Sequence, residues 1–169
     1  MRQAQSGAKR MAMSDLLKIS LPDGSVREYP KGTTSMQVAL SISEGLARKV
    51  LAAEINGEVW DATRPIQNDA SLKLLTWDDK GGQNTFWHSS AHLMAEAIES
   101  MFPGVKFWVG PPVENGFYYD VDLGDRSITE EDMRKLEVKM AELAKKNNTY
   151  IRKEIPKAEA VQYFSDKGD

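Results

Sequence analysis

The sequence predicts an α+β protein made of two small domains. Strand-like and helical segments both occur along its 169 residues, and a Gly81-Gly82 pair separates a strand-rich first part from a helix-and-hairpin second part. Hydrophobic residues make up 41% and charged residues 28%, which is typical of a globular protein with a buried core. We place the first domain at residues 14–77, a flexible linker at 78–83 and the second domain at 84–169.

Composition argues against several functions. The net charge of −3 gives no general electrostatic reason to bind nucleic acid, so an RNA contact would need a local basic patch. The chain has no cysteine, which excludes disulfides and fits a cytoplasmic protein. No apolar run approaches the ~20 residues of a membrane span, so no membrane partner is expected. The net charge of −3 likewise gives no reason to expect a DNA partner. Residues 1–13 predict a disordered extension, with Met1, Met11 and Met13 as alternative starts.

The first domain begins with a hairpin. Leu16 to Leu21 and Val26 to Tyr29 read as strands, and Pro22-Asp23-Gly24-Ser25 joins them as a turn. The segments expected to follow are a helix capped by Thr33 or Thr34 with the apolar stripe Met36, Ala39, Leu40, Leu46 and Ala47, then strands at 50–55, 58–60 and 71–77, the first two joined by Asn56-Gly57. This order is that of a β-grasp, or ubiquitin-like, fold. The chain contains no G-x-x-x-x-G-K-[ST] phosphate-binding loop, so a GTPase has no support.

The second domain opens with a helix from about Asn84 to Met101, which Phe102-Pro103-Gly104 ends. Its expected apolar stripe is Phe86, Leu93, Ala97 and Met101, widened by Met94 and Ile98. Glu114-Asn115-Gly116 predicts a hairpin between strands at 105–113 and 117–123. The remaining expected elements are a helix capped by Thr129 with the buried face Met133, Leu136, Met140 and Leu143, a strand at 149–155 and a short helix at 157–165.

Both histidines of the chain fall in one short run, His88-Ser89-Ser90-Ala91-His92. Four residues apart on a helix, their imidazoles lie on one face, where they could share a metal, a water or a substrate group. The alternative is a purely structural or exposed pair. A metalloprotease would need Glu where Ser89 stands, and a zinc site would need a further ligand, so we expect no metal site in this chain.

Two motifs carry a family resemblance. With Leu21-Pro22-Asp23-Gly24-Ser25 near its start, the first domain resembles the TGS domain of threonyl-tRNA synthetases, some GTPases and stringent-response synthetases. The His88–His92 run followed by the Gly110–Leu123 segment, GPPVENGFYYDVDL, resembles the editing domain of threonyl/alanyl-tRNA synthetase type. Together, in this order, the two halves resemble the start of a bacterial threonyl-tRNA synthetase across nearly the whole chain.

The resemblance implies a parent enzyme that loads threonine onto its tRNA with ATP and hydrolyses serine attached in error. It maps the catalytic histidine pair onto His88 and His92 and the substrate-binding pocket residues onto Gly110 and Tyr119. Threonine tRNA is the implied partner and a homodimer the implied state of the parent, while ATP, magnesium and zinc belong to its missing catalytic domain. No cofactor is expected in this chain.

Two departures and two alternatives stand beside this interpretation. One departure is that the aminoacylation core of the family and its anticodon-binding domain are missing here. The family pocket also uses a C-x-x-x-H pair and a lysine further along, and this chain has neither a cysteine nor a third histidine. We therefore expect the chain alone to be inactive in both ligation and editing. The alternatives are a free-standing β-grasp module that binds RNA or protein, and an independent deacylase for mischarged tRNA.

Overall fold

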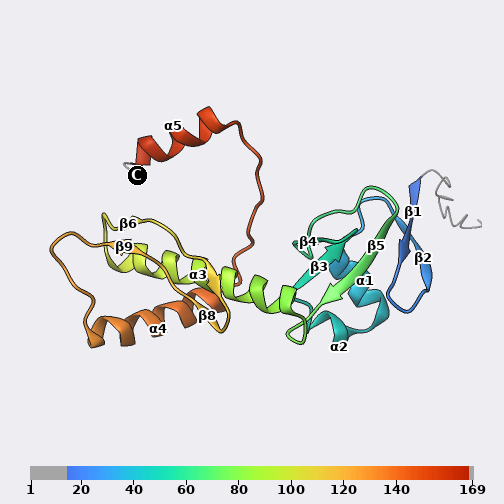
Figure 1. Ribbon diagram of the computed structural model, residues 1–169, viewed down its shortest axis with the longest axis horizontal. Coiled ribbons are helices and arrows are strands. Elements are labelled where there is room, and N and C mark those ends of the chain that lie inside the picture. The colour runs from blue at the N-terminus through green and yellow to red at the C-terminus, as the bar shows by residue number, and fades with distance from the viewer. Residues whose placement is uncertain (1–14, 168–169) are drawn as a thin grey trace, which may run out of the picture. The chain divides into compact units, whose positions relative to one another are not determined.

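The computed structural model describes residues 15–167 (Figure 1). The predicted N-terminal extension, residues 1–13, lies outside the described residues. The chain divides into two compact units whose boundary falls between Phe86 and Trp87, inside the helix α3 (Lys80–Met101). Each unit is described by itself.

The first unit is a β-grasp fold, as predicted. A sheet of five strands has the order β2-β1-β5-β3-β4. Only the β1–β5 pair is parallel, and the other neighbours are antiparallel. The strands are β1 (Leu16–Ser20), β2 (Val26–Pro30), β3 (Ala52–Ile55), β4 (Glu58–Trp60) and β5 (Ala70–Leu75).

One face of this sheet packs against the helix α1 (Ser35–Ile42). The alternation along β1 and β5 turns Leu17, Ile19 and Leu72 to that side, where they are buried with Val38 of α1. The helix begins at the predicted cap: the Thr34 hydroxyl accepts from the Gln37 N–H, and the Gln37 side chain accepts from the Thr34 N–H.

The single helix expected after Thr34 is in fact two. Ser43 is extended, with φ −165°, and its hydroxyl accepts from the Leu46 N–H to cap a second short helix, α2 (Glu44–Ala47). A serine side chain can satisfy helix-terminal N–H groups in this way, so one helix ends before Ser43 and a second begins after it. Leu40, predicted in the apolar stripe, is exposed, whereas Ala39 and Ala47 are buried as expected.

The predicted flexible linker is wrong in its local structure. The helix α3 begins at Lys80, so Gly81 and Gly82 lie in its first turn. A Cβ built on Gly82 would lie 2.0 Å from the Thr76 carbonyl oxygen, so only glycine allows the helix to approach the end of β5 this closely. Phe86, expected in the stripe of the second domain, instead packs edge-on against Trp77, with ring centroids 5.2 Å apart.

The second unit is built around α3 and α4 (Glu130–Lys145), which lie side by side (Figure 1). One buried cluster joins the two helices. It comprises Ala97 and Ile98 of α3, Phe102 directly after α3, and Leu136 and Leu143 of α4. Thr129 caps α4 as predicted, in a reciprocal arrangement with Asp132. Met133, predicted on the buried face, is exposed.

The long hairpin expected between the two helices forms as two short ladders. They comprise β6 (Lys106–Phe107) with β9 (Val121–Asp122), and β7 (Pro112–Val113) with β8 (Gly116–Phe117). The short helix near the end is present as α5 (Lys157–Lys167).

The strand predicted at 149–155 is not formed. The alternation of apolar and polar residues is there, but a strand needs a partner for its backbone hydrogen bonds, and the structure pairs none with this stretch. Ile151 is accordingly 78% exposed.

Candidate functional site

The two histidines lie on the exposed side of α3. Their imidazole centroids are 4.7 Å apart, with an angle of 44° between the ring planes, as the four-residue spacing on a helix requires. Both side chains are solvent-exposed, so they are available to a ligand and are not core residues. The structure therefore brings His88 and His92 together as the sequence predicted.

Partial burial lowers the pKa of His92 below its usual value, and the neighbouring His88 lowers it further. Two cationic imidazoles at this distance would repel each other, so the pair favours a form with His92 neutral. A neutral imidazole has one nitrogen that can accept a proton and one that can donate a hydrogen bond. This pair can thus hold a water or a hydroxyl group at neutral pH.

The helix line beside the histidines faces the hairpin. Trp87 packs on Phe117 of β8, with ring centroids 6.0 Å apart and tilted by 39°. Ala91, one turn further along, is completely buried. Neither residue was predicted to contact the hairpin, although each directly precedes a histidine in the sequence and so lies on the helix line next to the pair.

A one-residue bulge interrupts the hairpin. Lys106 lies opposite Asp122 and Phe107 opposite Val121, whereas Pro112 lies opposite Phe117, which requires one extra residue on the first strand. Two backbone hydrogen bonds locate it: the Trp108 N–H donates to the Asp120 oxygen (3.0 Å) and the Asp120 N–H donates to the Val109 oxygen (2.8 Å). Trp108 and Val109 therefore share one partner.

Beyond the bulge, this register puts Gly110 opposite Tyr119, the two residues predicted for the pocket. A Cβ built on Gly110 would lie 2.3 Å from two carbons of the Tyr119 ring, so the ring occupies the space that a side chain at position 110 would take. Phe107 holds the same ring edge-on, with centroids 5.3 Å apart. Glycine at 110 thus lets Tyr119 lie flat on the neighbouring strand.

The structure therefore assembles the four predicted residues as two pairs, one on the helix and one on the hairpin. The contact between Trp87 and Phe117 joins the two elements beside these pairs. That all four residues line one open cleft stays a prediction.

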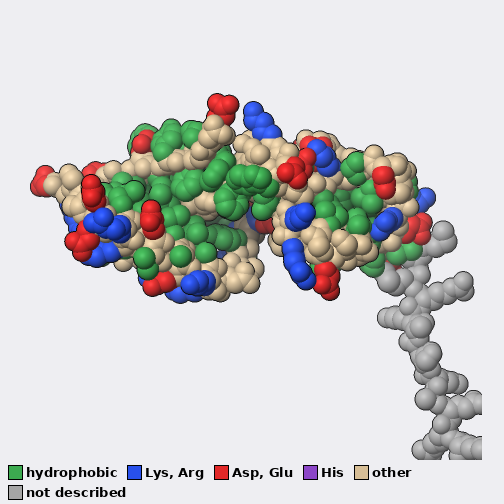
Figure 2. Space-filling view, turned by 90° about the horizontal axis from the view of Figure 1, so that it is seen from below, with side chains coloured by type: hydrophobic (Ala, Val, Ile, Leu, Met, Phe, Trp, Pro, Cys, Tyr) green, Lys and Arg blue, Asp and Glu red, His purple; other side chains and the backbone are tan. Residues whose placement is uncertain are grey.

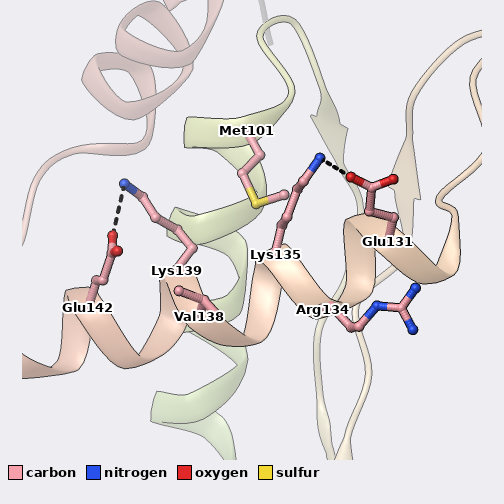
Figure 3. Close-up of a pocket in the computed structure, with 7 residues that line it drawn as sticks. All are labelled: Met101, Glu131, Arg134, Lys135, Val138, Lys139 and Glu142. Carbon is pink, nitrogen blue, oxygen red and sulfur yellow. Dashed lines mark ion pairs between the residues drawn. The ribbon is translucent and has the colours of Figure 1, made fainter.

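A groove of about 430 Å³ lies elsewhere, along α4 and over Met101 (Figure 3). None of the four predicted residues lines it. Its cations are paired: Lys135 contacts Glu131 at 2.7 Å and Lys139 contacts Glu142 at 3.8 Å. Arg134 contacts Glu130 at 4.0 Å, and of the three cations only Lys139 is half-buried. These charges form the more polar side of α4.

Within residues 15–167, no group of three or more His, Cys, Asp or Glu side chains is arranged to hold a metal ion. Over the same described range, no helix has both the length and the apolar character needed to cross a membrane.

Comparison with known proteins gives one consistent family. A model of the TGS domain matches residues 17–76. Threonine–tRNA ligases from Cytophaga hutchinsonii, Parabacteroides distasonis and Bacteroides fragilis are 62%, 56% and 50% identical to the chain over 154 residues. These alignments cover 91% of the chain but 24% of each relative, so the chain spans about a quarter of the length of the curated relatives it matches. The chain thus corresponds to the N-terminal region of threonine–tRNA ligases, with a TGS domain at residues 17–76.

Proposed function

We propose that this chain contributes part of a proofreading site to a threonine–tRNA ligase, where serine attached in error to threonine tRNA is hydrolysed. The observation that carries the proposal is the pairing of two exposed histidines on α3 beside a hairpin on which Tyr119 lies over Gly110. The parent protein would attach threonine to its tRNA using ATP. Its ATP, magnesium and zinc sites and its dimer contacts would lie outside this chain, and its location would be cytoplasmic.

The reaction has a physical motive. Serine lacks one methyl group of threonine, and a methyl group gives only ~1–3 kcal/mol of discrimination in a binding pocket. A second, hydrolytic check on the charged tRNA is therefore useful. Hydrolysis of the aminoacyl ester needs a positioned water and a group that takes a proton from it as it attacks the carbonyl carbon.

The residues divide into two roles. His88 and His92 hold the attacking water and the terminal ribose, since a neutral imidazole can both accept a proton and donate a hydrogen bond. Tyr119 contacts the aminoacyl group. Gly110 acts through Tyr119, because its missing side chain leaves the space in which the ring lies.

The test uses a full-length threonine–tRNA ligase that carries this N-terminal region. Replacing both histidines with alanine should slow hydrolysis of serine-charged threonine tRNA by about 10²-fold or more, the usual contribution of a general base. Threonine activation should stay unchanged. Glu99→Gln is the matched control, because Glu99 is exposed on the same line of α3. Unchanged deacylation in the double variant would remove the histidines from the mechanism.

The independent-deacylase alternative has a direct test of its own. The 169-residue chain is incubated with serine-charged threonine tRNA, and release of serine is followed. We expect no release, because the chain has no cysteine and no third histidine with which to complete the family pocket. Release above the uncatalysed rate would favour the alternative.

The binding-module alternative receives no electrostatic support from the β-grasp sheet. On the sheet face opposite α1, Lys18 of β1 lies across from Glu28 of β2. Lys73 of β5 likewise lies across from Glu54 of β3. Each lysine is thus balanced by a glutamate on the neighbouring strand, which is not how a phosphate-binding surface is built.

A further inference from the structure

The chain contains two Asn-Gly pairs at hairpin turns, and the structure gives them different environments. Asn56 and Gly57 form the two-residue turn between β3 and β4, with φ +51° and +87°. The Asn56 side-chain oxygen accepts from the Ser71 N–H at 2.9 Å and from the Ser71 hydroxyl at 3.2 Å. The Asn56 N–H donates to the Ser71 oxygen at 3.1 Å. Three hydrogen bonds to Ser71 of the adjacent strand therefore hold this asparagine.

Asn115 and Gly116 stand at the tip of the β7–β8 hairpin, where Val113 pairs with Gly116. The Asn115 side chain is exposed, and among the described residues it has no hydrogen-bond partner. Gly116 has φ +151°, a backbone conformation rare for other residues. The ladder behind this tip comprises two residue pairs, compared with a five-stranded sheet behind Asn56.

We infer that Asn115 is a site of spontaneous deamidation, whereas Asn56 is protected by its fold. The Gly116 backbone nitrogen loses its proton and attacks the Asn115 side-chain carbonyl carbon. A carbon–nitrogen bond forms, the side-chain nitrogen leaves as ammonia, and a five-membered succinimide results. Water then opens either carbonyl of the ring to give aspartate or isoaspartate, so the net reaction consumes one water and releases one ammonia.

The difference in rate follows from what must move. The attack needs the asparagine side chain to swing over the following N–H, which glycine leaves unhindered in both pairs. At Asn56 the two side-chain hydrogen bonds to Ser71 must break first, which corresponds to at least about tenfold in rate. At Asn115 no such bond opposes the movement.

The modification would act on the hairpin that carries Tyr119. Aspartate would add a negative charge beside Glu114, and isoaspartate would also lengthen the backbone of the turn by one carbon. Because pairing register depends on turn length, the longer turn weakens the Val113–Gly116 and Pro112–Phe117 pairs. The inference itself does not depend on the proposed function.

The experiment follows the folded chain during incubation at mildly alkaline pH. Proteolytic fragments are weighed, and isoaspartate is labelled with an isoaspartyl methyltransferase. We expect the product at Asn115 to accumulate at least about tenfold faster than at Asn56, for the reason given above. Asn115→Gln should abolish the product there and leave Asn56 unchanged.

Two comparisons separate the effect of the fold from that of the local sequence. In denaturant the two sites should react at similar rates, and Ser71→Ala in the folded chain should speed the reaction at Asn56. Equal rates at the two sites in the folded chain would overturn the inference, as would a ratio that is the same in the folded and the denatured chain.

Discussion

The β-grasp unit and the helix–hairpin unit use the same kinds of residues with different results. In the first unit, strands that are far apart in the sequence pair to form a five-stranded sheet, and Leu17, Ile19 and Leu72 are buried almost completely. In the second, strands of two residues pair only with near neighbours, and Trp108 is 84% exposed. Figure 2 shows apolar side chains gathered over a broad area of this second unit.

Local sequence signals are therefore enough to form helices and turns but not to bury an apolar surface. Hairpins and caps satisfy their own hydrogen bonds from residues nearby. A closed core needs a second layer, which in the first unit is α1 and in the second is α4 along only part of α3. Apolar faces such as that of α5 therefore remain exposed.

Replacing a buried leucine should cost far more stability than replacing an exposed aromatic residue. Leu72→Ala should lower the free energy of unfolding of the first unit by about 2–5 kcal/mol, because it leaves a cavity in the core. Phe164→Ala on α5 should change the stability of the second unit by no more than about 0.5 kcal/mol. Denaturant titration followed by circular dichroism measures both, and a comparable loss in the two variants would erase the contrast between the units.

Next in size is the close approach of α3 to β5. Gly82→Ala should destabilise the first unit by about 1–3 kcal/mol, since the new methyl meets the rigid Thr76 carbonyl. Gly81→Ala is the matched control, because its methyl meets only side-chain ends, those of Leu75 at 3.0 Å and Val59 at 3.7 Å, and the variant gains helix propensity. Thermal unfolding compares them. If Gly82→Ala were as stable as Gly81→Ala, these first residues of α3 would be dispensable to the first unit.

A smaller loss of stability is expected at acidic pH, through Asp79. The Lys73 ammonium at 2.7 Å, and then the Thr76 N–H, hold the pKa of Asp79 below its usual range. A depressed folded-state pKa gives stability that is complete above about pH 3.9 and lost as the pH falls through the folded pKa. Asp79→Asn should therefore be less stable than the wild type at neutral pH, and the two should converge in acid.

Asp78→Asn, at the neighbouring exposed position, serves as the control for the acid experiment. Unfolding midpoints across the acid range give the readout. A constant gap between Asp79→Asn and the wild type at every pH would show that Asp79 acts without its charge.

The smallest effect concerns the exposed face of α3 in the second unit. Nuclear magnetic resonance should show His92 titrating below the ordinary histidine value of about 6.5, because burial and His88 both oppose its protonation. His88→Ala should raise the His92 midpoint only in part, since burial is the larger cause. Ser89→Ala should leave it unchanged. A His92 midpoint at or above the ordinary value would mean that this face is as solvated as the rest of the surface.

Local chemistry made much of this molecule predictable. The turn at Pro22 to Ser25, the caps at Thr34 and Thr129 and the Asn-Gly turn after Ile55 depend on residues within a few positions, and each forms as expected. The spacing of His88 and His92 fixed their common face for the same reason.

What could not be predicted depends on remote neighbours. The glycine pair at 81–82 has the composition of a linker, and only the position of Thr76 makes Gly82 a packing residue. The alternation at 149–155 fits a strand, but its formation requires a partner. At the candidate site, Gly110 and Tyr119 were identified separately, while their contact depends on an extra residue two positions earlier that no local pattern reveals.

The extra residue at Trp108–Val109 reverses the side of the strand to which the following side chains point. Side chains along a strand alternate between two sides, so every position after an insertion exchanges odd for even. Phe107 before the bulge and Gly110 after it both lie against the Tyr119 ring, although their spacing of three would put them on opposite sides of an unbroken strand. Deleting one residue here would look minor in an alignment, but it would move each later side chain of the strand to the opposite face.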